Sequence, residues 1–213
     1  MIPRDSDAEH AIIEHYHQHA AQFQAQYDSL VAEEVHADWA SLLDSCVPGR
    51  ALDVGAGSGR DALWLMRKGW QVTAVEPAQG LRERGQRTTG KQVKWVDTQL
   101  PLLSNLERPA EGYDLILLSA VWMHLPQNER PQAFTRLAEL LATTGRLIIT
   151  LRFGPSDPKR PMYDVSVDEL RQLAQPQRLE LQRLGPEISI DRLQRPEVSW
   201  QTLCLRPVGS ISA

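Results

Sequence analysis

Three closely spaced glycines between an apolar run and an amphipathic run constrain this chain more than any other feature. The segment from Arg50 to Trp64 reads RALDVGAGSGRDALW. Ala51 to Val54 has the length and composition of a buried strand, and Asp61 to Met66 carries apolar residues at helical spacing. A strand, a tight turn and a helix in this order predict the first unit of a doubly wound α/β fold. The glycines remove Cβ atoms that would hinder a ligand, and the following helix presents free N–H groups to it.

The spacing of the glycines distinguishes two classes of cofactor. The motif is D-x-G-x-G-x-G, with Asp53 two residues before Gly55 and further glycines at Gly57 and Gly59. A dinucleotide fold needs G-x-G-x-x-G, and Arg60 occupies the place of its last glycine. An acidic residue so close to the loop disfavours a pyrophosphate and suits a cationic ligand. The alternative is a tight strand–helix turn whose glycines are incidental.

This motif resembles the first motif of the class I S-adenosylmethionine-dependent methyltransferases. The resemblance covers most of the segment from Arg50 to Arg152. It implies a Rossmann-like α/β fold whose seven-stranded, doubly wound sheet is mostly parallel and has an antiparallel last strand. It also implies S-adenosyl-L-methionine as cofactor and S-adenosyl-L-homocysteine as product. The cofactor site is then expected to include Asp53, Gly55, Ala56, Gly57 and Gly59.

A second acidic residue follows the next expected strand. Trp70 to Val75 predicts that strand, and Glu76 comes directly after it, 23 residues beyond Asp53. This is close to the spacing of the acid that binds ribose hydroxyls in a βαβ unit. An ionised carboxylate offers two acceptor oxygens, which match the two donors of a vicinal diol. We therefore expect Glu76 to bind a ribose, with Pro77 beside it in the cofactor site.

A third acidic residue, Asp97, ends the strand expected over Gln92 to Val96. The resemblance implies that this acid contacts the amino group of adenine, with Thr98 beside it. The chain departs from the family at this point, because Asp97-Thr-Gln-Leu-Pro is one residue shorter than the usual spacing to Leu-Pro. The cofactor is expected to lie across the ends of the first and second strands.

Leu115 to Ser119 is a nearly continuous apolar run, typical of a strand buried on both faces. The loop after it contains Trp122, Met123 and His124, and it is similar to the fourth-strand loop of the family. Ligands of this fold bind outside the carboxyl ends of the strands, so Ser119 is expected at the cofactor and Trp122 at the wall of the site. His124 has the unperturbed pKa of a general base. Alternatively, its ring shapes the site without moving a proton.

The residues before the first strand predict a helical cover, residues 1–48. One apolar stripe contains Ile13, Tyr16, Ala20, Phe23, Tyr27 and Leu30, and a second helix is expected over residues 31–43. In the resembled family such a segment closes over the cofactor, which implies that Tyr16 and Tyr27 face the ligand. Packing against the sheet is the alternative. The histidines of HYHQH, residues 15–19, have no third ligand at zinc spacing and are expected on a solvated helix face.

The second half of the chain predicts the rest of the sheet. A helix is expected over 129–141, a fifth strand over 146–152 and a short helix over 167–174, with Ser166 as its cap. Alternating residues over 179–184 and 198–205 predict a last, hairpin-like pair of strands. Residues 49–207 are thus expected to form the cofactor-binding core, with 208–213 as a tail.

Composition limits the class of partner. The 213 residues fit one domain, and the net charge of −4, from 23 basic and 27 acidic residues, argues against a broad nucleic-acid footprint. Cys46 and Cys204 form no CxxC pair, so neither zinc nor a disulfide framework is expected. The sequence shows no secretory leader and no 18-residue apolar run, which predicts a cytoplasmic monomer or homodimer with no membrane partner.

Three functions remain open. The favoured one is methyl transfer to an N, O, S or C atom of a small molecule, with Trp122, Arg152 and Arg160 as candidate substrate residues and no metal. The second is methylation of RNA or protein, in which Arg152, Lys159, Arg160 and Arg192 would bind phosphate or carboxylate groups. No Asn-Pro-Pro-Tyr-like or Asp-Pro-Pro-Tyr-like tetrad follows Leu118, which disfavours methylation of base amino groups. The third is a non-catalytic protein that only binds the nucleoside.

Overall fold

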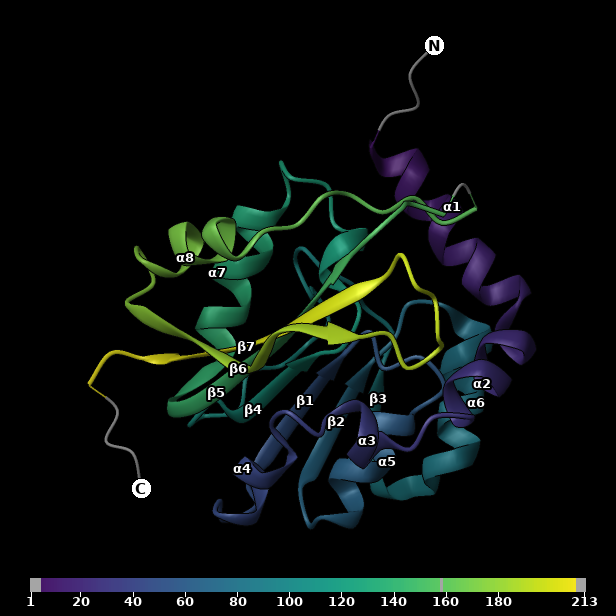
Figure 1. Ribbon diagram of the computed structural model, residues 1–213. Helices are drawn as coiled ribbons and strands as arrows, with labels where there is room; N and C mark the ends of the chain where they lie inside the picture. Colours follow the sequence, from purple (N-terminus) through teal and green to yellow (C-terminus); the bar gives the residue numbers. More distant parts are fainter. Residues whose placement is uncertain (1–4, 158, 210–213) are drawn as a thin grey trace.

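One seven-stranded sheet organises the molecule (Figure 1). The computed structural model describes residues 5–157 and 159–209, with side chains from His10 onward. The strand order is β3-β2-β1-β4-β5-β7-β6, and β7 alone runs opposite in direction to the other described strands. The doubly wound fold is therefore confirmed, including the antiparallel strand near its end. The strands are β1 (Arg50–Val54), β2 (Gln71–Val75), β3 (Lys94–Val96), β4 (Tyr113–Leu118), β5 (Leu141–Phe153), β6 (Leu179–Ile190) and β7 (Ser199–Pro207).

Helices cover both faces of this sheet (Figure 1). Because successive strand residues point to opposite faces, Leu52 and Ile116 pack on one side and Ala51 and Leu117 on the other. The first side is covered by α7 and α8, and the second by α4 and α5. The helices are α1 (Asp5–Gln18), α2 (Ala20–Asp28), α3 (Ala32–Val35), α4 (Ala40–Asp44), α5 (Arg60–Arg67), α6 (Gln79–Thr89), α7 (Arg130–Leu140) and α8 (Val167–Ala174), with short 3-10 helices η1 (Gly90–Gln92) and η2 (Trp122–His124).

The first expected helix is broken in two at His19, so the prediction of one continuous helix is wrong. His19 has φ −103° and ψ 18°, outside the α-helical range, and its Nδ1 lies 3.0 Å from the carbonyl oxygen of His15. The change of direction lets both α1 and α2 contact α6. On α2, Ala20 and Phe23 bury their side chains against Ala78 and Leu81 at the start of α6.

The second expected helix is also interrupted, giving α3 and α4. A turn at residues 36–39 separates them. Trp39 and His36 are buried there, and Trp39 Nε1 donates to His36 Nδ1 at 3.2 Å. His36 also lies 3.0 Å from Asp61 of α5. Burial of this polar pair against the core accounts for the turn, which the apolar spacing alone does not indicate.

The last strands are longer than the sequence pattern indicates. β6 continues to Ile190, and its pairing with β7 is irregular between Leu184 and Ser189, where Gly185 has φ +72°. The extra residues reach past the carboxyl end of β4. They place the connection between β6 and β7 beside the ends of the parallel strands, where the ligand crevice of this fold lies.

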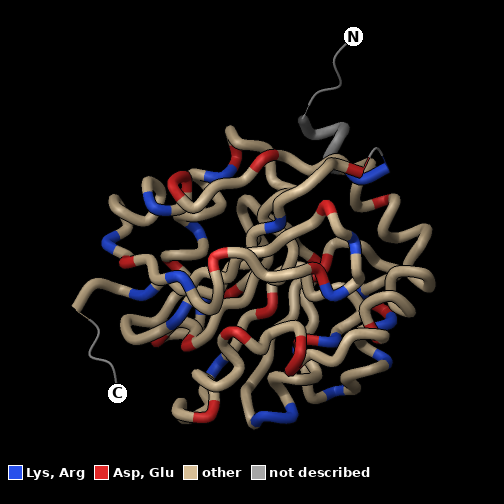
Figure 2. Tube along the Cα trace, viewed as in Figure 1, with Lys and Arg blue, Asp and Glu red and all other residues tan. Residues whose placement is uncertain are grey.

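Charges are intermixed over the described chain, with basic and acidic residues alternating along the trace (Figure 2). None of the described helices is long and apolar enough to cross a membrane. Cys46 and Cys204 are free cysteines.

Candidate functional site

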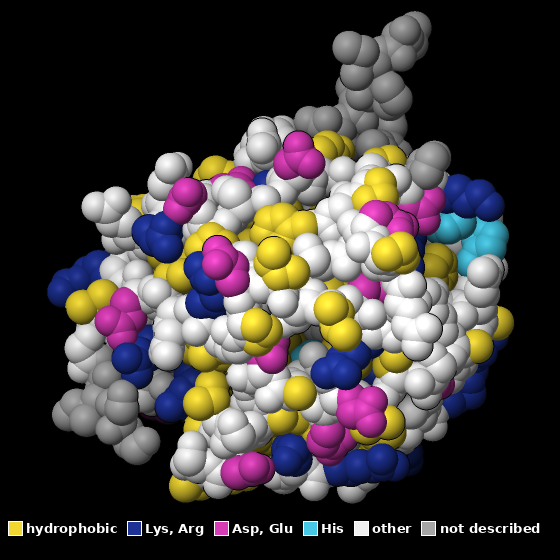
Figure 3. Space-filling view, viewed as in Figure 1, with side chains coloured by type: hydrophobic (Ala, Val, Ile, Leu, Met, Phe, Trp, Pro, Cys, Tyr) yellow, Lys and Arg dark blue, Asp and Glu magenta, His cyan; other side chains and the backbone are white. Residues whose placement is uncertain are grey.

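A cavity of about 520 Å³ opens at the carboxyl ends of the parallel strands. Its proximal half is formed by the glycine loop after β1 and by the residues that follow β2 and β4. Its distal half is formed by the ends of β5 and β7 and by residues 186–195 after the irregular part of β6. Residues of α1 to α3 close the cavity from the side. Figure 3 shows a small opening on this face, bordered by hydrophobic and basic side chains.

The glycine loop forms the floor of the proximal half. Gly55 and Gly57 have φ of +72° and +56°, which side-chain-bearing residues rarely adopt. The N–H groups of Gly55 and Ala56 donate to the carbonyl oxygen of Val75, at 2.8 and 2.9 Å, and this holds the loop against the end of β2. A Cβ atom on Gly57 would lie 3.3 Å from the ring of Tyr27. The loop therefore exposes backbone toward the cavity, opposite Tyr27.

Glu76 joins the glycine loop to the residues that begin α6. Its Oε2 accepts from the Gly57 N–H and its Oε1 from the Ala78 N–H, both at 2.9 Å. Burial raises the pKa of Glu76 to about 7, although the two amide donors and Arg82 act in the opposite direction. Each carboxylate oxygen has a second lone pair after these bonds. The carboxylate thus positions the loop and still has acceptor capacity toward the cavity.

Asp53 lies beneath the cavity wall instead of in it, with 1% of its surface exposed. Its Oδ2 has no hydrogen-bond partner among the described residues. Burial, followed by the neighbouring Asp61, raises the pKa of Asp53 well above its usual value. Asp61 itself accepts two hydrogen bonds from Arg60, at 2.7 and 2.9 Å. Arg60 and His36 hold the pKa of Asp61 far below its usual range despite burial.

His124 belongs to a chain of three polar side chains that spans the middle of the cavity. Arg160 Nη1 donates to the Tyr16 hydroxyl at 3.1 Å, and that hydroxyl lies 3.2 Å from His124 Nε2. His124 Nδ1 lies 3.3 Å from the carbonyl oxygen of Pro161. A carbonyl only accepts, so Nδ1 carries the proton and Nε2 accepts from Tyr16. Burial, and to a smaller degree the charge of Arg160, lowers the pKa of His124 to about 4.

Both tyrosines expected at the ligand line the cavity. Phe23 lies between them, with ring centroids 4.6 Å from Tyr16 and 5.9 Å from Tyr27. Arg160 lies over this group, 5.2 Å from the ring centroid of Phe23. Burial raises the pKa of Tyr27 well above its usual value. The tyrosines therefore pack on the core and also face the cavity.

Trp122 does not line the cavity, so its expected place at the wall is wrong. Its side chain is fully buried and packs edge-on against Phe134 of α7, 6.3 Å between centroids. The reason is the turn of η2, which directs Trp122 into the core and leaves Met123 and His124 at the wall. Ser119 lies in the wall.

Three other residues expected at the cofactor lie outside the wall. The side chain of Asp97 is 65% exposed and forms an ion pair with Arg82 at 2.8 Å. Thr98 is absent from the wall, to which Gln99 and Leu100 contribute instead. Gly59 caps α5 with φ +86°, and its Cβ would meet Trp95 at 3.1 Å, so its role is packing between α5 and α6. The remaining site residues expected from the sequence, Ala56, Pro77, Arg152 and Arg160 among them, do line the cavity.

Several wall residues of the distal half had no signal in the sequence. Asp191, Arg195 and Trp200 form one group there: Arg195 donates to both oxygens of Asp191, at 2.8 and 2.7 Å, and Trp200 Nε1 donates to it at 2.9 Å. These bonds lower the pKa of Asp191 to about 2, against the effect of burial. For Trp200 the sequence offers one signal, since its spacing of two residues from Thr202 on one strand puts both side chains on the same face.

The histidine run does not form a simple solvated face, in contrast to the expectation. His17 Nδ1 accepts from the Gly80 N–H at 3.0 Å and so joins α1 to the first turn of α6. His15 lies edge-on to Phe23, with centroids 5.7 Å apart. No group of three or more metal-binding side chains occurs in the part of the chain that the structure describes.

Comparison with known proteins places residues 51–145 in a family described as a methyltransferase domain. Glycine N-methyltransferase of Oryctolagus cuniculus is 32% identical over 119 residues, 48% of this chain and 40% of its own length. An uncharacterized methyltransferase of Staphylococcus carnosus is 27% identical over 114 residues, 54% of this chain and 52% of its own length. The matched segments thus span about half the length of these curated relatives.

Two solved structures share the fold over most of the chain. The first is the 1,6-didemethyltoxoflavin-N1-methyltransferase of Burkholderia thailandensis, with bound 1,6-didemethyltoxoflavin and S-adenosylhomocysteine. It has a TM-score of 0.72 at 18% identity and covers 97% of this chain and 92% of its own. The second, magnesium protoporphyrin IX methyltransferase of Synechocystis PCC 6803 with bound SAM, has a TM-score of 0.61 at 19% identity over 86% and 81% of the two chains. At these identities the likeness shows the fold alone.

Proposed function

We propose that this chain is a class I S-adenosylmethionine-dependent methyltransferase, which transfers a methyl group from S-adenosylmethionine to an N, O, S or C atom of a small molecule. The observation that carries this proposal is the proximal half of the cavity. A glycine loop with exposed backbone, a buried carboxylate with acceptor capacity and an aromatic ring converge there. Backbone donors and a carboxylate acceptor suit a nucleoside with ribose hydroxyls.

The residues of the proximal half would hold this cofactor. The backbone of Gly55 to Gly57 would bind along one side, Glu76 would accept from the ribose hydroxyls, and Tyr27 would cover the loop. When bound, the cofactor supplies a methyl group activated by an adjacent sulfonium. The protein then needs to align the acceptor and to exclude water.

His124 is proposed to shape the site instead of moving a proton. Its Nε2 already accepts from Tyr16, and its lowered pKa, about 4, makes it a weak base at neutral pH. The Arg160–Tyr16–His124 chain joins α1 to the loop after β4 and to the residues after β5. The expected result is that α1 is held against the cavity, which keeps water out while the proximal and distal halves stay connected. Alignment and exclusion of water would then supply most of the rate enhancement.

A small acceptor fits the distal half better than a macromolecule. The cavity is covered by α1 to α3 and by residues 186–195, and Ser189 Oγ donates to Asp38 at 2.9 Å, which joins the two covers. Arg160, one of the cations that could bind phosphate, is already paired with Asp157 at 3.0 Å. The two structural neighbours described above are named for small-molecule methylation.

Titration of S-adenosylhomocysteine by calorimetry tests the cofactor site, with Gly57→Ala as variant and Gly90→Ala as matched control. Both glycines have positive φ, +56° and +63°, so both substitutions carry a backbone cost. The cost is larger at Gly90, because its ψ of −149° lies in a region that is essentially restricted to glycine, and thermal melts establish that each variant is folded. Only the Cβ at Gly57 faces the cavity; that at Gly90 meets nothing within 4 Å. We expect Gly57→Ala to weaken binding about tenfold or more and Gly90→Ala to bind as the wild type. Equal binding by the two variants, or none by the wild type, contradicts the proposed site.

A further inference from the structure

The distal half of the cavity has a floor made by two antiparallel strands. Thr150 and Arg152 of β5 pair with Thr202 and Trp200 of β7, and all four line the cavity. Residues two apart on a strand share a face, so Arg152 lies about 7 Å beyond Thr150 on the same side. Thr150 Oγ1 accepts from the Ala120 N–H at 2.8 Å, next to the end of β4. Arg152 is thus placed beyond the cofactor half, where the methyl acceptor would lie.

Arg152 is a buried cation whose guanidinium is only partly used. The residue is 8% exposed. Its Nη1 donates to the carbonyl oxygens of Pro155, at 3.0 Å, and Gly154, at 3.4 Å. Its Nε is buried and has no hydrogen-bond partner in the described chain. Burial and the neighbouring Arg195 and Arg160 lower the pKa of Arg152, and this outweighs the opposite effect of Asp191 and Glu197.

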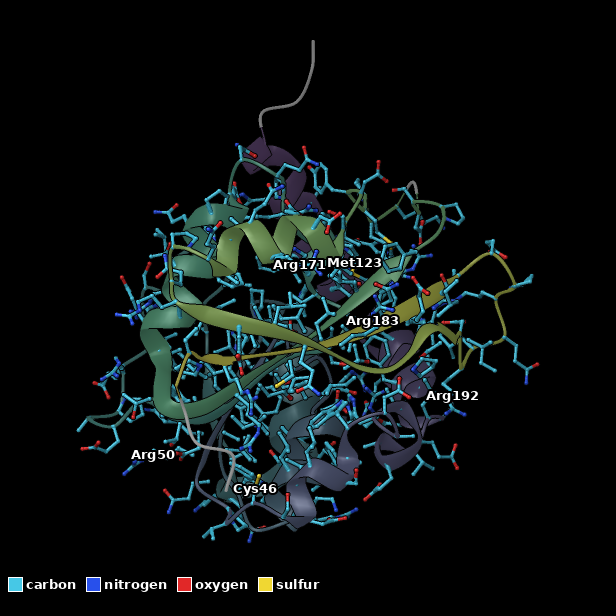
Figure 4. The ribbon with its side chains drawn as sticks, turned by 60° about the vertical axis from the view of Figure 1, so that its left-hand side comes forward. Cys46, Arg50, Met123, Arg171, Arg183 and Arg192 are labelled. Carbon is cyan, nitrogen blue, oxygen red and sulfur yellow. The ribbon has the colours of Figure 1, made fainter. Side chains whose placement is uncertain are left out.

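The other arginines of the distal half differ from Arg152 in having partners or in facing solvent. Arg195 is bound through two hydrogen bonds to Asp191, and Arg160 is bound to Asp157. Arg192 is exposed at the rim, on the connection after β6 (Figure 4). Among the described residues, the buried charge of Arg152 therefore forms no ion pair, although Asp191 and Glu197 lie near enough to act on it. A buried charge is costly unless it is paired.

Apolar side chains form part of the wall around this cation. Met162, Ile188, Leu193 and Trp200 line the distal half, and Met123 contributes from η2 (Figure 4). An apolar part of the wall beside one buried cation without an ion pair matches a ligand with an apolar body and a single anionic group. A planar carboxylate fits the free edge of a guanidinium, which offers N–H donors in a fixed fork.

We propose that the methyl acceptor is an apolar carboxylic acid and that Arg152 binds its carboxylate. This inference rests on the proposed function, since it assigns the acceptor of that reaction. The apolar body would lie against Trp200 and the neighbouring wall, between Arg152 and the methyl group. Arg152 binds the carboxylate, which is not itself the nucleophile. Pairing with the guanidinium stabilises the carboxylate oxygens and so lowers their nucleophilicity. The methylated atom would belong to the part of the molecule nearer to His124.

Matched pairs of probes test this assignment in protein saturated with S-adenosylhomocysteine. We would titrate benzoate against benzamide, and indole-3-carboxylate against its amide, by calorimetry at constant ionic strength. Each pair shares its apolar body and differs in the anionic group. Because a charge-assisted pair with arginine is lost in the amide, the acids are expected to bind about tenfold tighter or more. Phenyl phosphate, a dianion, is expected to bind more weakly than benzoate.

Two substitutions test whether Arg152 causes the preference for the acid over the amide. Arg152→Gln should abolish the difference between acid and amide, and Arg152→Lys should retain part of it, because lysine keeps the charge and loses the fork. Arg171→Gln is the control, since Arg171 is exposed on α8 and lies outside the cavity wall (Figure 4). Its preference should equal that of the wild type. Thermal melts of each variant establish that it is folded.

The outcomes separate this inference from the proposed function. Failure of the wild type to bind S-adenosylhomocysteine refutes the proposed function. If that ligand binds, equal affinity for acid and amide, including no binding of either, refutes the carboxylate site and leaves the function standing. A preference that survives in Arg152→Gln also refutes the role of Arg152. Tighter binding of phenyl phosphate than of benzoate would assign the site to phosphate esters and overturn the carboxylic acid.

Discussion

Cofactor binding should release a proton from Glu76 below neutral pH. In the free protein burial raises the pKa of this carboxyl group to about 7, so it is largely protonated at pH 6. A ribose diol would donate two hydrogen bonds to the carboxylate, and hydrogen bonds to the charged form lower a pKa. The bound form is therefore expected to be ionised at pH 6, and the proton must leave on binding.

The size of this effect follows from the difference in pKa. A shift from 4.5 to about 7 corresponds to about 3 kcal/mol against the ionised form in the free protein. If binding restores a pKa near 4.5, about 0.9 proton is released per ligand at pH 6 and about 0.1 at pH 8. Affinity should then be nearly constant above pH 7. Below pH 7 it should weaken about tenfold for each unit, until the pKa of the bound form is reached.

Calorimetry in buffers of different ionisation enthalpy measures the released protons directly. Glu76→Gln keeps the size of the side chain but cannot titrate, so it should bind more weakly and release no proton at pH 6. Asp53→Asn is the control for the other buried carboxyl group whose pKa is raised, and it should leave the release from Glu76 in place. Absence of proton release in the wild type at pH 6, with tight binding, would show that Glu76 is ionised in the free protein and refute the reasoning.

Two further predictions concern His124 and the helical cover. His124→Gln should lower kcat less than about tenfold and leave cofactor affinity unchanged, because the ring acts through its hydrogen bond to Tyr16. A loss in kcat of about 100-fold or more would identify a general base instead, if the acidic limb near pH 4 in the pH–rate profile also disappears. We also propose that the cover expected over residues 1–48 acts as a lid on the core expected over 49–207. Amide hydrogen exchange in α1 and α2 should therefore slow when S-adenosylhomocysteine is added, and unchanged exchange would indicate a static packing role.

Elements with a local cause could be predicted from the sequence. The strand, turn and helix around Gly55 to Gly59 follow from residues that are neighbours in the chain, and so does the position of Glu76 at the end of β2. The cap of α8 is local as well: Ser166 Oγ accepts from the Glu169 N–H at 3.0 Å. The expected tail over 208–213 can be followed only to residue 209, because 210–213 lie outside the described residues.

Other features depend on groups that are distant in sequence, and only the tertiary structure decides them. Tyr16 and His124 are 108 residues apart, yet the packing of α1 beside the loop after β4 brings them within 3.2 Å. The carboxylate of Glu169, which suits a capping box, binds Arg130 at 2.7 Å instead. The charge of Arg152 makes it a candidate from the sequence alone. Only the structure shows that its Nε has no hydrogen-bond partner among the described residues, whereas Arg160 and Arg195 are paired with Asp157 and Asp191. Periodicity and turn chemistry specify which face a residue occupies; which side chain it meets there is determined by how distant segments pack, because contact energies are gained only when the whole core forms.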